Sequence, residues 1–404
     1  MVAELMSKEE VPLASWAGRT KRSELQRMLS LASRPGILSL ALGLPAAELF
    51  PTEDFARAAA AVLAGEPRAL QYSPPLQALK AHVVRLMALR GVECCESQVF
   101  LTAGAQQGLN MLARLLLDPG GCVLTEELCY PGLQQVVEPY LPEVLTVPTC
   151  TETGIDVEAV GRLLAGGARP SFIYTVTEGH NPLAVSMSRG KRERLVELAR
   201  EFRVPVVEDD PYGLLFYDGE LEPPMRALDE DWVFYVGSFS KVLAPSLRAG
   251  WCVVPEPLTR QLSIIKEASD IDTATFSQRA VSAYLDAGHL PAHLERLRRE
   301  YGLRRDAMLR AVAEHFPGEA AWHKPTSGVF TWVELPREVD TGELLRAAVE
   351  DEQVAFIPGS AFDVHARGRT HGIRLNFSHH PAPVIEEGVA RIGRVLKEAL
   401  RVSR

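Results

Sequence analysis

Apolar runs and amphipathic stretches alternate through the middle of the chain. The apolar runs are short and rich in β-branched and aromatic residues, as buried strands are, and they cover residues 99–102, 122–125, 171–176, 205–208, 233–237 and 250–254. The stretches between them repeat apolar positions every three or four residues, as helices do, at 106–117, 156–164 and 188–202. This order predicts an α/β domain with a largely parallel sheet, because parallel neighbours need crossover connections.

The pattern changes in the last third of the chain. A long, charged helical region at residues 285–316 marks the exit from the first domain. Beyond it the pattern indicates a smaller α+β domain, with strands at 329–334, 354–357 and 372–376 and helices at 342–351 and 383–401. At the other end, a helical run at 23–32 precedes a turn-rich stretch at 42–51. We therefore expect an N-terminal segment that joins the small domain, then a large domain and a small C-terminal domain, at residues 1–50, 51–288 and 289–404.

The composition is that of an ordinary globular protein. Of 404 residues, 47% are hydrophobic and 24% are charged, and the net charge of -9 is not gathered into blocks of one sign. This distribution argues against nucleic acid as a partner. No window approaches the roughly 20 apolar residues of a membrane span, and acidic residues stand where a signal peptide needs a basic flank. We expect a soluble, cytoplasmic protein with no membrane partner.

The cysteines indicate a reducing compartment. No CxxC pair and no zinc-like pairing with histidine is present among Cys94, Cys95, Cys122, Cys129, Cys150 and Cys252. Reduced thiols in the cytosol are the simplest interpretation, and we expect no metal site.

Lys241 is the sharpest local feature. It directly follows an apolar strand, is flanked by Ser238 and Ser240, and precedes Arg248 by seven residues. Ligands of open α/β sheets bind at the carboxyl ends of strands, where a partly desolvated lysine becomes a nucleophile for carbonyls. The hydroxyls and the guanidinium suit a phosphate. The lysine taken alone is equally consistent with a solvated turn.

Two further strand ends carry polar groups. Residues 102–108 join a strand to a helix whose free N–H groups can bind an anion, although a plain glycine-rich turn has the same pattern. This stretch lacks the P-loop lysine and the GxGxxG spacing, so nucleotide binding is a poor explanation of it.

Asp209 ends another apolar strand. A buried carboxylate needs a partner, and a protonated heteroaromatic nitrogen is suitable. A surface turn is the alternative, and metal-like spacing is absent.

Arg374 lies inside an apolar strand and requires an anionic partner. Either a substrate carboxylate or a structural salt bridge satisfies that requirement.

Together these residues resemble a known family. Their order and spacing are similar to those of the fold-type I, pyridoxal-phosphate-dependent aminotransferases of class I/II, most closely the 2-aminoadipate and kynurenine aminotransferase subgroup. The resemblance extends over nearly the whole chain and includes segments 34–39, 43–51, 70–74, 104–107, 236–245 and 354–359. It implies a fold-type I architecture, with the cofactor pyridoxal 5'-phosphate (PLP) bound by the large domain.

The resemblance also implies residue roles around the cofactor ring. Lys241 matches the lysine that forms the Schiff base and then transfers the proton. Asp209 matches the carboxylate that pairs with the ring nitrogen, and Asn181 and Tyr212 match the donors to the ring oxygen. Tyr130 resembles the aromatic residue that stacks on the ring.

The cofactor phosphate has its own predicted set of donors. Backbone N–H groups come from Ala105 and Gln106, hydroxyls from Ser238 and Ser240, and a guanidinium from Arg248. All five are implied by the resemblance.

Substrate and subunit contacts follow from the same resemblance. Arg374 matches the arginine that binds the substrate α-carboxylate, and Tyr72 resembles the tyrosine that reaches the neighbouring subunit's phosphate, which implies a homodimer with shared active sites. Gly43 lies in the loop that borders the substrate. Asn181, beside the cofactor ring, is also expected to contact the substrate. Gln26 falls near the position where aminoadipate-type members carry an arginine for the distal carboxylate.

One loop departs from the family pattern. Residues 178–185 read Glu-Gly-His-Asn-Pro-Leu-Ala-Val, where the family usually has Asn-Pro-Thr-Gly. Either the loop has drifted with unchanged chemistry, or His180 adds an acid/base group near the substrate.

The resulting functional hypothesis is amino-group transfer from an α-amino acid to a 2-oxo acid or another carbonyl acceptor, through the Lys241 Schiff base. The nearest alternative is a biosynthetic lyase, cyclase or oxidase on the same scaffold. A regulatory or binding protein built on the fold is the third, because fold alone does not prove activity.

Overall fold

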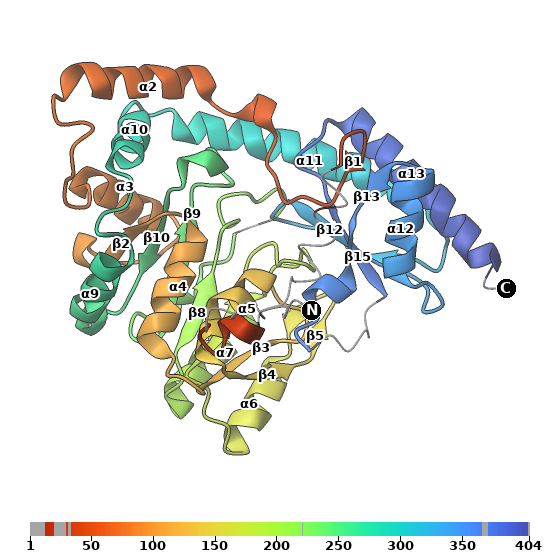
Figure 1. Ribbon diagram of the computed structural model, residues 1–404, viewed down its shortest axis with the longest axis horizontal. Helices are drawn as coiled ribbons and strands as arrows, with labels where there is room; N and C mark the ends of the chain where they lie inside the picture. The colour runs from red at the N-terminus through yellow and green to blue at the C-terminus, as the bar shows by residue number, and fades with distance from the viewer. Residues whose placement is uncertain (1–12, 20–29, 31–33, 220, 366–370, 403–404) are drawn as a thin grey trace, which may run out of the picture.

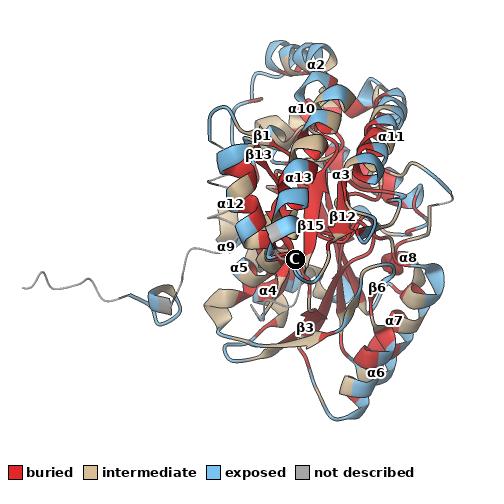
Figure 2. Ribbon diagram, turned by 90° about the vertical axis from the view of Figure 1, so that its right-hand side faces the viewer, coloured by how far each residue is buried: buried red, intermediate tan, exposed pale blue. Residues whose placement is uncertain are grey.

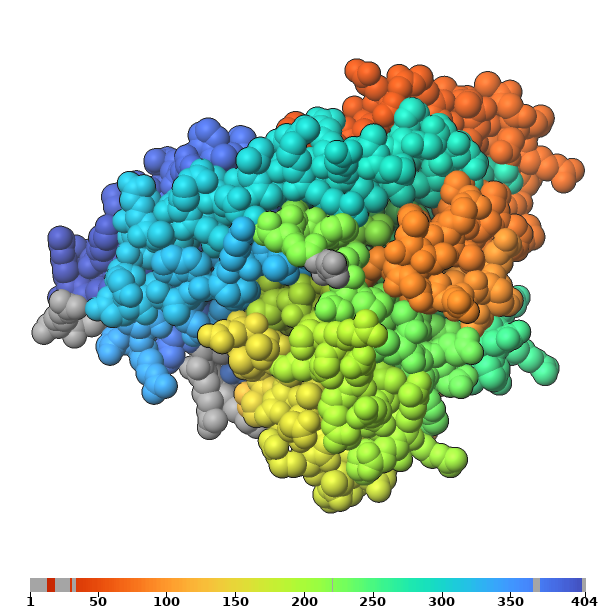
Figure 3. Space-filling model, turned by 180° about the vertical axis from the view of Figure 1, so that it is seen from behind, coloured from red at the N-terminus to blue at the C-terminus, as the bar shows by residue number. Residues whose placement is uncertain are grey.

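The computed structural model describes residues 13–19, 30, 34–219, 221–365 and 371–402. Two main sheets organise this part of the chain, and the smaller one lies beside the larger with α11 (Leu290–His315) extending along both (Figure 1). No helix among these residues is long and apolar enough to cross a membrane. Viewed from behind, α11 forms a ridge between the C-terminal part, in blue, and the N-terminal helices, in orange (Figure 3).

The larger sheet has seven strands in the order β2-β10-β9-β8-β7-β3-β4. Neighbours are parallel except at β10, which is antiparallel to both β2 and β9. The strands are β2 (Val99–Thr102), β3 (Cys122–Glu126), β4 (Glu143–Val147), β7 (Phe172–Val176), β8 (Val206–Asp209), β9 (Val233–Ser238) and β10 (Gly250–Val253). All six predicted strands are present. The seventh, β4, is an edge strand that is mostly not buried, so it has no continuous apolar run to predict it.

Alternate strand residues pack on opposite faces of this sheet. On β7, Tyr174 packs in the cluster that contains Leu109 of α4, whereas Ile173 packs in the cluster that contains Leu195 of α7. Burial on both faces explains why the strands read as continuous apolar runs, and Figure 2 shows the buried residues concentrated there. The helices of this part are α2 (Thr52–Gly65), α3 (Gln77–Ala88), α4 (Ala105–Leu116), α5 (Pro131–Val137), α6 (Val157–Ala165), α7 (Arg189–Phe202), α8 (Met225–Leu228), α9 (Thr259–Asp270) and α10 (Thr275–Asp286).

The smaller sheet is antiparallel, in the order β11-β12-β15-β14. Its strands are β11 (Ala321–Trp322), β12 (Phe330–Glu334), β14 (Ile357–Pro358) and β15 (Gly372–Asn376), and the nearby helices are α11, α12 (Thr341–Asp351) and α13 (Ala382–Val402). An antiparallel pair β5 (Thr149–Cys150) and β6 (Gly154–Ile155) lies apart from both main sheets. The mostly parallel sheet with a second α+β unit confirms the predicted fold class.

Two predicted elements are divided in the structure. The strand expected at 354–357 is β13 (Val354–Ala355) followed by β14, and β13 pairs in parallel with β1 (Leu38–Ser39) instead of joining the smaller sheet. The helical region expected at 285–316 is split between α10 and α11, with Gly288 at φ 74° between them. The helix expected at 23–32 lies outside the described residues, apart from Ser30. The domain boundaries stay a prediction.

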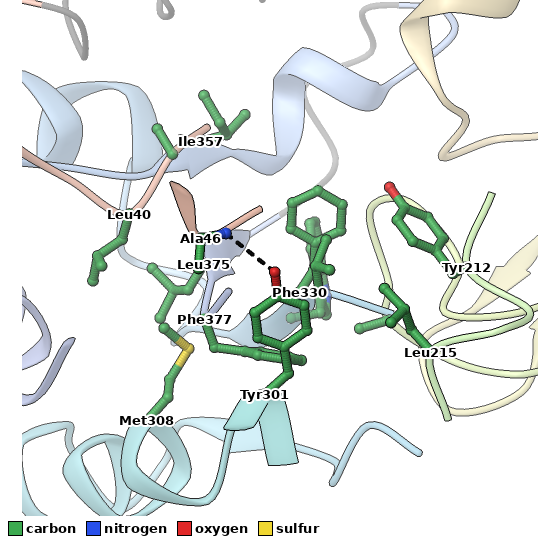
Figure 4. Close-up of a cluster of buried hydrophobic side chains, with 14 of the residues drawn as sticks. Leu40, Ala46, Tyr212, Leu215, Tyr301, Met308, Phe330, Ile357, Leu375 and Phe377 are labelled. Carbon is green, nitrogen blue, oxygen red and sulfur yellow. Dashed lines mark hydrogen bonds between the residues drawn. The ribbon is translucent and has the colours of Figure 1, made fainter. Parts of the chain in front are cut away.

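The short 3-10 helices are η1 (Ala17–Arg19), η2 (Ala47–Leu49), η3 (Glu96–Gln98), η4 (Glu138–Tyr140), η5 (Pro245–Leu247), η6 (Glu256–Leu258) and η7 (Gly359–Phe362). Beside η2, the N-terminal loop is held on the core of the smaller sheet (Figure 4). The backbone N–H of Ala46 donates to the hydroxyl of Tyr301 on α11, at 3.1 Å, and Leu40 is completely buried. This contact fixes the loop that carries Gly43.

Candidate active site

A cavity of about 380 Å³ opens at the carboxyl ends of β7, β8 and β9. Strand ends of the larger sheet, the N-terminal loop and the start of β12 all contribute to it. Twelve of the predicted site residues line it, namely Gly43, Ala105, Gln106, Tyr130, Asn181, Asp209, Tyr212, Ser238, Ser240, Lys241, Arg248 and Arg374. Residues separated by more than 300 positions are therefore brought to one place.

Lys241 is half-buried, and its side chain lines the cavity. Its Nζ donates to the carbonyl oxygen of Gly43 at 2.7 Å. Burial, followed by the charges of Arg374 and Arg248, lowers the pKa of Lys241 to about 8. At pH 7 about a tenth of this amine is thus unprotonated and nucleophilic, far more than for an ordinary lysine, as the sequence predicts. A solvated lysine in a turn does not describe this environment.

Asp209 is a buried carboxylate with one free oxygen. Its Oδ2 accepts a hydrogen bond from the Tyr174 hydroxyl at 2.7 Å, while Oδ1 is buried without a hydrogen-bond partner. Burial raises the pKa of Asp209 to about 7. A buried acceptor without a partner is costly, so the cavity has a place for a ligand that donates a proton or carries a positive charge.

The start of α4 and Arg248 form an anion-binding corner. The guanidinium donates from Nη2 to the carbonyl of Ala103 at 2.7 Å and from Nη1 to the Ser240 hydroxyl at 3.4 Å. A Cβ on Gly104, whose φ is 88°, would lie 2.5 Å from Arg248 Nη2, so only glycine leaves room for the guanidinium. The first N–H groups of a helix lack partners within the helix, and together these donors suit a phosphate.

Arg374 reaches the cavity from β15. Its Nη1 donates to Asn181 Oδ1 at 2.6 Å and its Nη2 donates to the Ala41 carbonyl at 2.8 Å. The guanidinium carbon lies 4.0 Å from the Phe330 ring centroid and 4.8 Å from that of Phe362. Burial lowers the pKa of Arg374 to about 10, so it stays charged at neutral pH. Among the ion pairs of the described residues none involves Arg374, which leaves the structural salt bridge without support.

Two tyrosines border the same space. The Tyr130 hydroxyl donates to Gln106 Oε1 at 3.3 Å, and burial raises the pKa of Tyr130 to about 12. Tyr212 is buried, which raises its pKa too, and its ring meets Phe330 edge to face with centroids 6.1 Å apart. Both hydroxyls therefore remain protonated donors at neutral pH.

Three predicted site residues do not line this cavity. Tyr72 is 84% exposed, and Gln26 lies outside the described residues. His180 is buried, with Nε2 at 3.3 Å from Glu126 Oε1 and Nδ1 accepting from the Leu183 N–H. Both ring nitrogens of His180 thus have partners within the protein, and His180 does not line the cavity, so of the two alternatives the drifted loop fits this arrangement better.

Sequence reasoning missed two aromatic residues of the site. Phe330 lines the cavity, and Tyr174 supports Asp209 from behind. Both lie in buried strands, where periodicity identifies core positions and cannot distinguish a core aromatic from one that touches the site. Leu44 also lines the cavity, but it is a 39% exposed residue of the N-terminal loop, where no periodic pattern indicates its role.

Comparison with known proteins identifies the class. Residues 36–392 match the family described as "Aminotransferase class I and II", and the chain belongs to this family. It is a fold-type I, PLP-dependent aminotransferase, close to the aminoadipate and kynurenine subgroup, which confirms the predicted resemblance, activity and cofactor.

The relatives give this placement its detail. The chain is 36% identical to "Aromatic-amino-acid aminotransferase 1" of Thermococcus litoralis, over 94% of this chain and 93% of the relative. It is 37% identical to "2-aminoadipate transaminase" of Thermus thermophilus, over 95% of this chain and 96% of the relative. Among solved structures, the chain is similar to the alpha-aminoadipate aminotransferase of Thermus thermophilus complexed with N-(5'-phosphopyridoxyl)-L-leucine. The two superpose with a TM-score of 0.89 at 36% identity, over 96% of this chain and 98% of the other. These relatives give the lyase, cyclase or oxidase alternative no support.

The cavity fits the cofactor by its own chemistry. Asp209 Oδ1 lacks a partner, Lys241 is partly unprotonated, and the corner beside Gly104 presents donors for an anion. Among the described residues no group of histidine, cysteine or acidic side chains is suited to a metal ion.

Proposed function

We propose that this cavity binds PLP and transfers the amino group of α-amino acids with apolar or aromatic side chains to a 2-oxo acid. The observation that carries the proposal is the presence, in one cavity, of a half-buried amine, a buried carboxylate oxygen without a partner, and a buried arginine without an acidic partner. They match the three groups that the reaction must hold: the cofactor aldehyde, its ring nitrogen and the substrate carboxylate.

The chain's residues divide the work. When bound, PLP supplies an electron sink for the pair left at the substrate Cα. Lys241 Nζ attaches the cofactor and, as a free amine, removes the proton from Cα. With PLP bound, Asp209 Oδ1 would accept from the ring nitrogen and so keep it protonated, while Asn181 and Tyr212 would donate to the ring oxygen. Tyr130, which lines the cavity, would pack against the ring.

A second set of residues would hold the phosphate of PLP and thereby keep its ring beside these groups. The donors are the backbone N–H groups of Ala105 and Gln106, the hydroxyls of Ser238 and Ser240, and Arg248. The contacts of Arg248 with Ala103 and Ser240 support this role, because they hold the guanidinium in place before the phosphate binds.

Arg374 binds the substrate α-carboxylate. A guanidinium offers two parallel donors to a planar anion. Its present acceptors are the neutral oxygens of Asn181 and Ala41, and a charged carboxylate is a stronger acceptor than either.

The lining favours apolar substrate side chains. Among the described residues that line the cavity, the cations are Lys241, Arg248 and Arg374, and each has a role above. No cation is left in that set for a distal carboxylate, whereas Leu42, Leu44 and Phe330 offer apolar surface. We give His180 no part in substrate binding.

The substrate proposal is tested by absorbance. Phenylalanine and leucine, added to the PLP-loaded protein, should convert the cofactor with kcat/KM at least about tenfold above that for glutamate or 2-aminoadipate, the difference expected for leaving a charge unpaired. A preference for the acidic donors contradicts the proposal.

The assembly and location complete the proposal. Tyr72 is exposed and outside its own cavity, as expected for a residue that reaches the phosphate of a second copy in a homodimer. The six cysteines are free thiols, which supports a cytoplasmic enzyme of amino acid metabolism.

A further inference from the structure

Tyr174 approaches the catalytic carboxylate from inside the protein. In the pairing of β7 with β8, Val176 lies opposite Asp209, so Tyr174, two residues earlier, projects from the same face of the sheet. Its ring is buried among apolar neighbours, and its hydroxyl donates to Asp209 Oδ2 at 2.7 Å. Tyr174 does not line the cavity.

The hydrogen bond from Tyr174 is the one that holds the Asp209 side chain among the described residues. No other hydrogen bond or ion pair to the Asp209 side chain occurs within the described part of the chain, and Oδ1 has none. Of the three influences on the pKa of Asp209, burial and Asp210 raise it, and Tyr174 lowers it. The neighbouring Asp210 has its own partners, Arg90 and Tyr235, and does not share them.

One oxygen is thus occupied and the other is left for the cavity. A carboxylate held by one oxygen cannot rotate freely, and a hydrogen bond to the ionised form favours that form. Both effects act at the oxygen that must accept from the ring nitrogen.

We propose that Tyr174 is a positioning residue for the cofactor: its hydroxyl holds the Asp209 carboxylate ionised and turned so that Oδ1 meets the PLP ring nitrogen. The proposal rests on the role of Asp209 in the proposed function. Tyr174 would thus help to keep the ring protonated, although it touches neither the cofactor nor the substrate.

The chain contains a matched control. Tyr235, on β9, is also buried, and its hydroxyl donates to Asp210 Oδ2 at 2.9 Å. Tyr235→Phe therefore removes the same kind of buried tyrosine-to-aspartate hydrogen bond one residue further along the chain from Asp209. Arg90 stays on Asp210 at 2.9 Å, and Asp209 is not touched. A purely structural tyrosine predicts similar effects for both variants.

The experiment compares Tyr174→Phe, Tyr235→Phe and Asp209→Asn, each loaded with PLP labelled with ¹⁵N in the ring. The ring-nitrogen chemical shift reports its protonation at neutral pH, and titration of the cofactor-free protein gives the Kd for PLP. Tyr174→Phe should move the shift toward the unprotonated value and weaken PLP binding about tenfold, the effect of one hydrogen bond to a charged group. Tyr235→Phe should leave the shift unchanged and the Kd within about twofold of wild type.

The outcomes separate the two proposals. If Asp209→Asn changes the shift and Tyr174→Phe does not, or if Tyr235→Phe changes it as much as Tyr174→Phe, the positioning role is overturned and the role of Asp209 stands. An unchanged shift in Asp209→Asn overturns the role of Asp209 itself. Thermal unfolding of each cofactor-free variant confirms that the comparison is made on folded protein.

Discussion

Arg374 and Asn181 are joined by a hydrogen bond of 2.6 Å, from the guanidinium Nη1 to the carboxamide oxygen. With its oxygen accepting from Arg374, the side chain of Asn181 has only its amide hydrogens to offer the cavity. Arg374 therefore fixes which way Asn181 points, so the residue that we propose binds the substrate carboxylate also orients the residue that we propose contacts the cofactor ring.

Arg374→Lys tests the carboxylate site. Lysine keeps the charge but loses the forked pair of donors. We expect kcat/KM for α-amino acids to fall about 100-fold, since two charge-assisted hydrogen bonds are weakened, with the Kd for PLP changed far less. Steady-state kinetics and a cofactor titration measure the two. Equal losses in both would assign Arg374 to the cofactor instead.

Lys241→Ala removes the amine that we propose attaches the cofactor. Turnover should fall by about 10³-fold or more, because the nucleophile and the proton carrier are lost together. Borohydride reduction followed by mass spectrometry should find cofactor bonded to the wild-type chain and none on the variant. Lys324→Ala, at an exposed lysine paired with Asp218, is the control and should behave as wild type. Covalent attachment that persists in Lys241→Ala disproves the assignment.

Covalent loading should follow the ionisation of Lys241. The pKa of this amine is lowered to about 8, and only the unprotonated amine attacks a carbonyl. The rate at which PLP becomes reducibly attached to the cofactor-free protein should therefore rise with pH and level off above about pH 8. A rise that continues to about pH 10.5, the range of an ordinary lysine, contradicts the buried environment.

Asp209→Asn should stabilise the cofactor-free protein in alkaline solution. The pKa of Asp209 is raised to about 7 from an ordinary value of 3.8, so the native chain holds a proton that the unfolded chain releases first. Native stability then decreases as pH rises from about 4 to 7. Each pKa unit corresponds to about 1.4 kcal/mol, so the variant should gain up to roughly 4 kcal/mol at pH 8 and little near pH 4. Urea unfolding at both pH values measures the gain, and a pH-independent difference contradicts this argument.

Hybrid dimers test the role of Tyr72. A Tyr72→Ala subunit paired with a Lys241→Ala subunit has one site with Lys241 from the first chain and Tyr72 from the second. Equal mixing of the two weakly active variants should restore activity to about a quarter of wild type, because half of the dimers are hybrids with one intact site each. Activity no greater than the mean of the two variants means that Tyr72 serves its own site.

The sequence predicted the large sheet well because its strands are buried on both faces. Edge strand β4 was missed because half-exposed residues interrupt its apolar pattern. Lys241, Arg248 and Asp209 were recognisable since charged residues at the ends of apolar runs need partners. Tyr174 and Phe330 could not be recognised from the sequence. An aromatic residue in a buried strand gives the same apolar pattern whether or not it touches a site.

His180 shows a different limit. Its position beside Asn181 placed it near the site, but one residue of displacement along a loop can reverse the direction of a side chain. Its partner Glu126 belongs to β3, more than 50 positions earlier, and nothing in the local pattern connects the two. Only the tertiary arrangement determines which of two adjacent side chains faces the cavity.

The pairing of β1 with β13 has a consequence for the order in which the protein is made. Leu38 lies opposite Val354, and a ribosome that adds about 5–20 residues per second needs roughly 15 to 60 s to synthesise the chain between them. The loop that follows β1 supplies the carbonyl of Gly43 to Lys241. β1 thus leaves the ribosome well before the strand with which it pairs, and the loop beside Lys241 is anchored at β1 only after β13 has been synthesised.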